Sequence, residues 1–221
     1  MMKKVVVISP HPDDETLGCG GTILRYKELG YKIYWINMTD MKIEYGYDER
    51  RVEKRSEEID KVCKMYEFDG FYNLELRPAY LDTYPKSEII MRISEIISEL
   101  EPNIVILPYE NDIHSDHKVT FDCIYSCSKI FRHPSIKKIL AMEIISETDF
   151  ALGDKGFLPN YFVDVTNYLE KKLEIMKIYE SELGRHPFPR SEDSINALAT
   201  LRGVQAGVEY AEGFRLIKYI E

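Results

Sequence analysis

Short apolar runs alternate along the chain with longer segments in which apolar residues recur at helical spacing. The runs predict buried strands, and the spaced pattern predicts amphipathic helices that turn one face toward a core. The predicted strands are residues 5–8, 32–37, 71–74, 104–107, 139–145 and 161–165, and residues 214–219 are a closing apolar stretch. The predicted helices are residues 22–29, 49–66, 89–100, 118–131, 168–183 and 191–206.

This alternation of strands and helices is typical of an α/β fold with a mainly parallel sheet. We expect a three-layer, Rossmann-like arrangement with helices on both faces of the sheet. The chain shows no internal repeat, low-complexity tract or linker, so residues 1–221 are predicted to form one domain.

Polar side chains gather directly after two of the predicted strands. His11, Asp13 and Asp14 follow residues 5–8, and His114 and His117 follow residues 104–107. Because the carboxyl ends of parallel strands lie at one edge of a sheet, where ligands bind in open α/β folds, we expect these side chains to form one site.

The composition narrows the classes of function. With 221 residues and a net charge of −9, the chain lacks the clustered basic residues that bind nucleic acid. No apolar run reaches the roughly 18 residues of a membrane-spanning helix. Four cysteines form no CxxC pair and no secretory signal is visible, so we expect free thiols and a cytoplasmic location. The sequence leaves self-association into a homo-oligomer open.

The two clusters supply the ligand types of a catalytic zinc site, which takes three protein ligands and keeps one position for water. We predict His11, Asp14 and His117 as the ligands. The same His and carboxylate set accepts Fe(II), Co(II) or Mn(II), so the metal is zinc or another divalent transition metal.

Asp13 lies next to a predicted ligand and is left free to act on the water. Zinc lowers the pKa of such a water to about 7, and a neighbouring carboxylate accepts its proton. We therefore predict Asp13 as the general base. His114, if protonated, can donate to the oxyanion and then to the leaving amine. Asp116 is predicted to support a histidine from behind.

Each of these features also has a simpler explanation. His-x-Asp-Asp alone is equally compatible with a surface turn, and only the second cluster favours a metal. The glycines of residues 18–21 lack dinucleotide-loop spacing and are interpreted as close packing of a helix on a strand. Arg55 is either a solvated helix charge paired with Glu58 or a cleft residue that binds sugar hydroxyls. His133 and His186 are expected at the surface or in loops.

With these residues in place, the sequence resembles the LmbE-like/PIG-L family of zinc-dependent N-acetylsugar deacetylases. The resemblance lies in residues 10–15 with 17–21, Arg55-x-x-Glu58, residues 114–117, residues 162–166 and residues 203–214. It implies the roles given above: His11, Asp14 and His117 as metal ligands, Asp13 as base and His114 as the oxyanion-stabilising acid. It also implies that Arg55 binds substrate.

The sequence departs from the family pattern in two respects. Met41 follows Asp40 where the family often has Gly-Glu, and residues 139–160 and 185–191 look like a subgroup variation that sets the substrate. The sequence does not say which of these residues contact the substrate.

The predicted activity is hydrolytic removal of an N-acetyl group from an amino sugar or an N-acetylglucosamine-containing glycoconjugate. Two alternatives stay open at this point. One is a metallohydrolase of another amide or of a phosphoester, which would usually need more basic groups or a second metal. The other is a non-catalytic module that binds a sugar nucleotide. The sequence names neither the acyl substrate nor its pathway.

Overall fold

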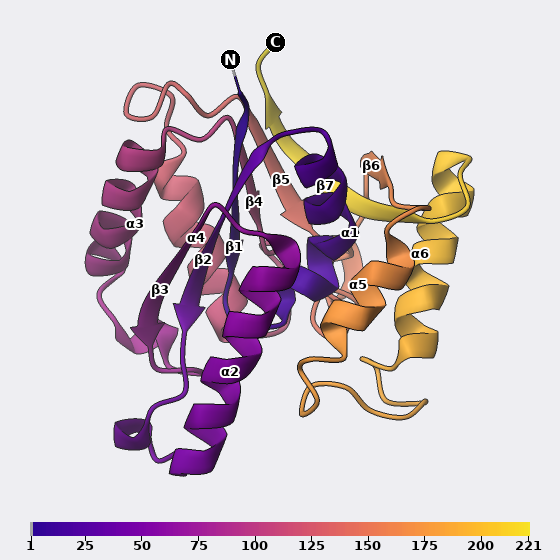
Figure 1. Ribbon diagram of the computed structural model, residues 1–221. Helices are drawn as coiled ribbons and strands as arrows, with labels where there is room; N and C mark the ends of the chain where they lie inside the picture. Colours follow the sequence, from indigo (N-terminus) through magenta and orange to yellow (C-terminus); the bar gives the residue numbers. More distant parts are fainter. Residues whose placement is uncertain (1) are drawn as a thin grey trace.

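The computed structural model describes residues 2–221 and contains one seven-stranded sheet (Figure 1). Its strands are β1 (Lys4–Ser9), β2 (Lys32–Thr39), β3 (Gly70–Leu76), β4 (Ile104–Leu107), β5 (Lys138–Met142), β6 (Tyr161–Asp164) and β7 (Ala211–Tyr219). Their order in the sheet is β3-β2-β1-β4-β5-β7-β6. The five strands from β3 to β5 are parallel, and β7 runs antiparallel to both β5 and β6. The prediction of a mainly parallel α/β sheet is confirmed.

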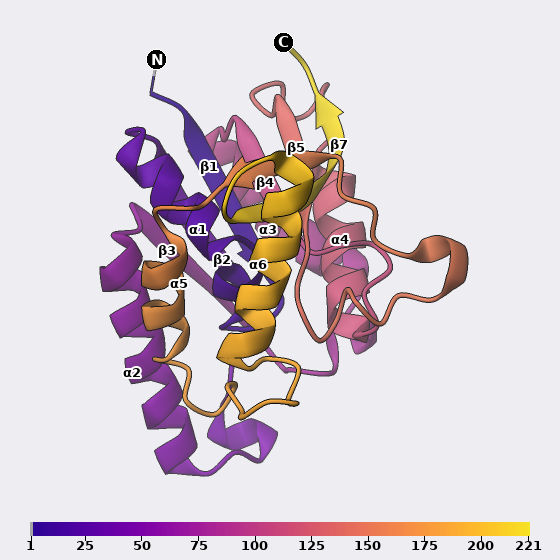
Figure 2. The ribbon, with the colours of Figure 1, turned by 90° about the vertical axis from the view of Figure 1, so that its right-hand side faces the viewer.

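Helices cover both faces of this sheet (Figures 1 and 2). They are α1 (Asp14–Glu28), α2 (Glu49–Tyr66), α3 (Lys86–Leu100), α4 (Ser115–Cys127), α5 (Leu169–Met176) and α6 (Glu192–Ala206). Val5 and Val7 of β1 pack in one core cluster with α1, α2, α5 and α6. Val6 and Ile8 point to the opposite face and pack with α3 and α4. Alternate residues of a central strand thus fill both cores, which explains its uninterrupted apolar run.

Some predicted boundaries are wrong. The helix predicted over residues 168–183 ends at Met176, because the following backbone tightens into turns in which Tyr179 N–H donates to Met176 C=O. These turns bring the buried Tyr179 hydroxyl to Glu15, at 3.0 Å. His133 lies in a loop as expected but is buried, with its Nε2 3.0 Å from the Ser94 hydroxyl.

Helix α1 is kinked at Cys19, whose backbone angles of φ −150° and ψ 23° are not helical. The second half of α1 therefore starts anew and exposes backbone N–H groups, which need partners. The Glu212 carboxylate of β7 accepts hydrogen bonds from the N–H groups of Gly21 and Thr22, at 2.9 and 2.7 Å. Lys172 of α5 donates to both Glu212 and the Leu17 carbonyl, so one buried ion pair satisfies both sides of the kink.

The glycines around this kink allow α1 to lie close to its neighbours. A Cβ on Gly18 would meet Sδ of Met142 in β5 at 2.7 Å, and a Cβ on Gly21 would meet Val165 at 2.7 Å. Both distances are shorter than real carbon contacts allow, so the interpretation of this stretch as close helix–strand packing is confirmed.

Within residues 2–221, none of the helices has both the length and the apolar composition of a membrane span. In the same residues, all four cysteines are free thiols.

Candidate functional site

The two polar clusters of the sequence meet at the carboxyl edge of the sheet. β1 and β4 are neighbouring parallel strands, so the loop after β1 and the loop after β4 lie side by side. The ring centroid of His11 is 4.7 Å from that of His114 and 5.5 Å from that of His117. The structure therefore brings together side chains that are more than a hundred positions apart in the chain.

Asp14 lies between two of these imidazoles. Its Oδ2 is 3.3 Å from Nδ1 of His11 and 3.3 Å from Nε2 of His117. One ligand atom from each of the three residues lies within 4.8 Å of the others, which is close enough for a single cation. This is the set predicted from the sequence.

The electrostatics of the three residues suit a positive charge at their centre. Burial lowers the pKa of His117, but the carboxylates of Asp14 and Asp112 outweigh it and raise that pKa to about 10. Burial also lowers the pKa of His11, but Asp116 and Asp14 outweigh it and raise that pKa to about 9. The carboxylates around the site therefore favour a cation there, either a proton or a metal ion.

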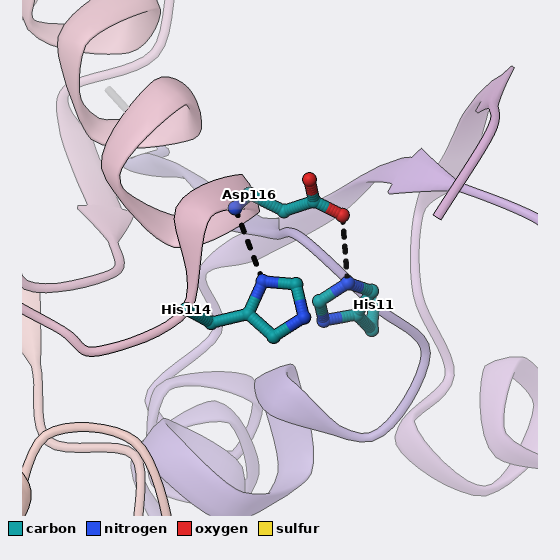
Figure 3. A group of neighbouring side chains, drawn as sticks. All are labelled: His11, His114 and Asp116. Carbon is teal, nitrogen blue, oxygen red and sulfur yellow. Dashed lines mark hydrogen bonds and ion pairs between the residues drawn. The ribbon is translucent and has the colours of Figure 1, made fainter. Parts of the chain in front are cut away.

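Carboxylates behind the rings fix which nitrogen faces the centre. His117 Nδ1 is 2.8 Å from Asp112 Oδ2, so a proton on Nδ1 is donated outward and Nε2 keeps its lone pair. Within residues 2–221, this buried Nε2 has no hydrogen-bond partner. His11 is held in the same way by Asp116, which lies 3.1 Å from its Nε2 (Figure 3). The donor set thus fits a divalent transition metal.

A second group of potential ligands consists of His11, His114 and Asp116 (Figure 3). Its atoms are already engaged. The Asp116 carboxylate accepts from the backbone N–H groups of Ala79 and Leu81, at 2.6 and 3.0 Å, and His114 Nδ1 accepts from Asp116 N–H at 3.1 Å. These bonds favour a supporting role for Asp116 and leave the His11, Asp14 and His117 group as the better metal site.

Asp13 lines a cavity of about 240 Å³ above this group. Its φ of 140° lies in a region that side-chain-bearing residues rarely adopt, at a cost of about 1–3 kcal/mol. Its backbone N–H donates to Glu15 Oε2 at 3.0 Å, which helps to hold this conformation. Burial, Asp14 and Glu182 hold the pKa of Asp13 well above its usual range, as befits a carboxylate that takes up a proton.

His114 also lines the cavity. Burial, followed by the nearby His11 and His117, lowers its pKa to about 4. Because its Nδ1 accepts the Asp116 N–H, the neutral ring carries its proton on Nε2. His114 can therefore donate a hydrogen bond from Nε2 as a neutral ring, so this donation does not depend on the protonated form considered from the sequence.

Arg55 is 4% exposed, so its interpretation as a solvated helix charge is wrong, although the pairing with Glu58 exists at 3.1 Å. The guanidinium lines the cavity and donates to the Pro12 carbonyl at 2.7 Å. It also binds Ser181 and Glu182. Arg55 thereby ties the loop after α5 to the turn that carries Asp13.

Four residues of this site were missed in the sequence. Asp112 stands two positions before His114 and was not distinguished from its polar neighbours. Glu147, Glu182 and Arg190 line the cavity from segments far along the chain. Glu147 and Arg190 belong to residues 139–160 and 185–191, the two segments interpreted as a subgroup variation. Their departure from the family pattern was the only sequence feature that could have pointed to these two residues. No feature of the sequence pointed to Glu182, because its role depends on contacts with Arg55 and Arg190.

Comparison with known proteins connects this site to a family. The family model described as PIG-L, GlcNAc-PI de-N-acetylase, matches residues 6–128. Diacetylchitobiose deacetylase of Thermococcus kodakarensis is 29% identical over 98% of this chain and 84% of its own length. A probable N-acetyl-alpha-D-glucosaminyl L-malate deacetylase of Bacillus anthracis is 21% identical over 81% of each chain.

Solved structures agree with the sequence comparisons. N,N′-diacetylchitobiose deacetylase from Pyrococcus horikoshii, solved with an inhibitor, superposes with a TM-score of 0.79 at 25% identity. The match covers 98% of this chain and 84% of that one. The arrangement of strands and helices described above is therefore shared over nearly the whole chain.

Proposed function

The chain belongs to the PIG-L family, and from this premise we propose that it is a metal-dependent amidohydrolase that removes the N-acetyl group of an N-acetylglucosamine-containing substrate. The observation that carries the proposal is the convergence of His11, Asp14 and His117, of which His11 and Asp14 line the cavity together with Asp13. Relatives of the chain are deacetylases of N-acetylglucosamine compounds, which supports the same substrate class here.

We propose zinc as the metal, held by His11 Nδ1, Asp14 Oδ2 and His117 Nε2. Fe(II), Co(II) and Mn(II) suit the same ligands. When bound, the cation polarises the amide carbonyl and lowers the pKa of water.

In this proposal Asp13 accepts a proton from the attacking water and passes it to the amide nitrogen as the C–N bond breaks, so that the amine can leave. Its carboxylate lies beside the metal group, and its raised pKa makes it a stronger base than an exposed aspartate. His114 donates its Nε2 hydrogen to the amide oxygen as negative charge develops there. Asp116 and Asp112 keep the two ligand imidazoles oriented.

Arg55 combines positioning with substrate binding in our proposal. A guanidinium carries five N–H donors. NH1 donates to the Pro12 carbonyl and NH2 donates to Ser181 and Glu182, while Nε forms an ion pair with Glu58. The second NH1 hydrogen is left for a sugar hydroxyl at the cavity wall. We further propose a cytoplasmic location, consistent with four free cysteines.

The first experiment measures acetate release by the zinc-loaded protein. N-acetylglucosamine, its nucleotide derivative, N,N′-diacetylchitobiose and N-acetylglucosaminyl L-malate are assayed together. Turnover of any of them supports the proposal. Stoichiometric zinc without acetate release, but with hydrolysis of a phosphoester, would favour the phosphoesterase alternative. A protein that binds no metal and only retains sugar nucleotides would be a binding module.

Two variants separate the proposed roles within the site. Asp13→Asn should retain stoichiometric zinc while kcat falls by about 10²–10⁴, because the proton acceptor is lost and the ligands remain. His117→Ala should lose zinc, because one of three ligands is gone. Metal content by plasma emission and steady-state rates on the best substrate check both. Normal turnover by Asp13→Asn would refute the assignment of the base.

A further inference from the structure

The cavity wall is rich in carboxylates. Five of them line it, and two guanidinium groups are the only basic side chains among its lining residues apart from histidine. The carboxylates are those of Asp13, Asp14, Asp40, Glu147 and Glu182. The group attached to the amino sugar therefore meets a negative potential unless the two arginines are free to offset it.

The two arginines are not free. Arg55 forms ion pairs with Glu58 and Glu182. Arg190 lies 3.3 Å from the other oxygen of Glu182 and donates from Nε to the Glu182 carbonyl at 3.0 Å. Two positive charges thus face two carboxylates. The pairs leave no net positive charge to bind an anion.

A metal ion held by His11, Asp14 and His117 does not give the cavity a net positive charge. Its two positive charges stand against the carboxylates of Asp14, a proposed ligand, and Asp13, which lines the cavity next to it. Asp40 and Glu147 are then the remaining charges of the wall.

Asp40 and Glu147 stand on opposite sides of the metal group. Asp40 directly follows β2, and Glu147 lies in the loop after β5. In the sheet, β2 and β5 flank the central strands β1 and β4 from either side. Among residues 2–221 neither carboxylate forms an ion pair. Asp40 accepts from the Asn73 amide at 2.6 Å and Glu147 from the Ser146 hydroxyl at 3.4 Å.

We propose that this site selects uncharged N-acetylglucosamine glycans over conjugates whose attached group is an anion, and that Asp40 and Glu147 set the preference. Ionised carboxylates accept strong hydrogen bonds from sugar hydroxyls. The same carboxylates repel a carboxylate or phosphate on the substrate in a partly enclosed cavity, where water screens poorly. The inference rests on the proposed deacetylase function and specifies its substrate.

The test compares substrates that differ in charge. N-acetylglucosaminyl L-malate and its dimethyl ester share the sugar and the carbon skeleton, and N,N′-diacetylchitobiose is the neutral glycan. We expect kcat/KM for the ester and the glycan to exceed that for the malate by about tenfold or more at low salt. The gap should narrow in about 1 M salt, where the Debye length is about 3 Å. Equal values, or a preference for the malate, would overturn the inference while leaving deacetylation intact.

Variants assign the preference to residues. Asp40→Asn and Glu147→Gln should each raise the malate-to-ester ratio of kcat/KM severalfold, to about tenfold, because each removes one repelling charge. Glu95→Gln removes the same charge from the exposed surface of α3 and should leave the ratio unchanged. A ratio that rises equally in Glu95→Gln would place the effect in the net charge of the chain and refute the role of the two residues.

Binding measurements distinguish a failure of this inference from a failure of the proposed deacetylase function. If the zinc-loaded protein hydrolyses none of the three compounds, the deacetylase proposal fails on these substrates. Calorimetric Kd values for the malate and its ester, measured on the same zinc-loaded protein, then decide the charge preference alone. Tighter binding of the ester supports it, and equal or weaker binding refutes it.

Discussion

Each ring nitrogen of His117 lies close to a carboxylate. Asp112 lies 2.8 Å from Nδ1, and Asp14 lies 3.3 Å from Nε2. The first contact fixes the tautomer, and the second marks the direction of the proposed metal. A histidine held in this way loses little freedom when it binds a cation, so Asp112 contributes to the metal site without touching the ion.

At this scale we predict that Asp112→Asn weakens zinc binding by about 10–100-fold, because an amide still accepts the Nδ1 hydrogen but lacks the charge that makes the imidazole a strong ligand. Zinc affinity is measured by competition with a chromogenic chelator. Asp122→Asn, an exposed change on α4, is the control. Activity at saturating zinc should largely return in Asp112→Asn. An unchanged affinity would contradict the supporting role.

Helix α1 is the element on which the site depends, because it begins with Asp14 and is preceded by Asp13. Its close packing requires the kink at Cys19, and the kink requires partners for the backbone groups it exposes. Lys172 and Glu212 supply them from α5 and β7. The C-terminal third of the chain thereby stabilises the turn that carries the chemistry.

At the scale of elements we predict that Lys172→Met destabilises the protein by about 3–5 kcal/mol, because it leaves the Glu212 carboxylate buried without its counter-charge. Lys171→Met is the matched control on the same helix. Its side chain is half-exposed and, among residues 2–221, pairs only with Glu174, so we expect a change within about 0.5 kcal/mol. Urea unfolding followed by circular dichroism measures both. Equal effects of the two variants would show that the kink does not need the buried pair.

At the scale of the whole molecule, the metal group joins separate parts of the fold. Its proposed ligands come from the loop after β1, the start of α1 and the first turn of α4. A cation bound there would hold the two helices against the central strands. That residues 1–221 act as a single deacetylase domain stays a prediction.

We accordingly predict that zinc raises the thermal stability of the entire chain. Free zinc at about a hundred times its Kd should add about 2.7 kcal/mol to the free energy of unfolding. At about 2–4 °C per kcal/mol, this corresponds to a rise in Tm of roughly 5–11 °C. Scanning calorimetry with and without a chelator measures it. His117→Ala should show no such rise, and an equal rise in that variant would place the stabilising zinc elsewhere.

The sequence by itself determined the alternation of strands and helices and the two polar clusters at strand ends, because both follow from local pattern. Val5 to Ile8 had to be a buried strand, and parallel strands had to bring His11 toward His117. That these residues share one site could therefore be predicted, and the structure brings them together. Their roles as metal ligands and as base stay predictions.

Only the tertiary structure decided which charges face each other. Arg55, Glu182 and Arg190 form one network, and Glu147 faces the cavity from a segment with no regular pattern. Helix α5 ends at Met176, and the turns that follow bring the Tyr179 hydroxyl to Glu15. Such pairings depend on distances between residues far apart in the chain, and hydrophobic periodicity carries no information about them.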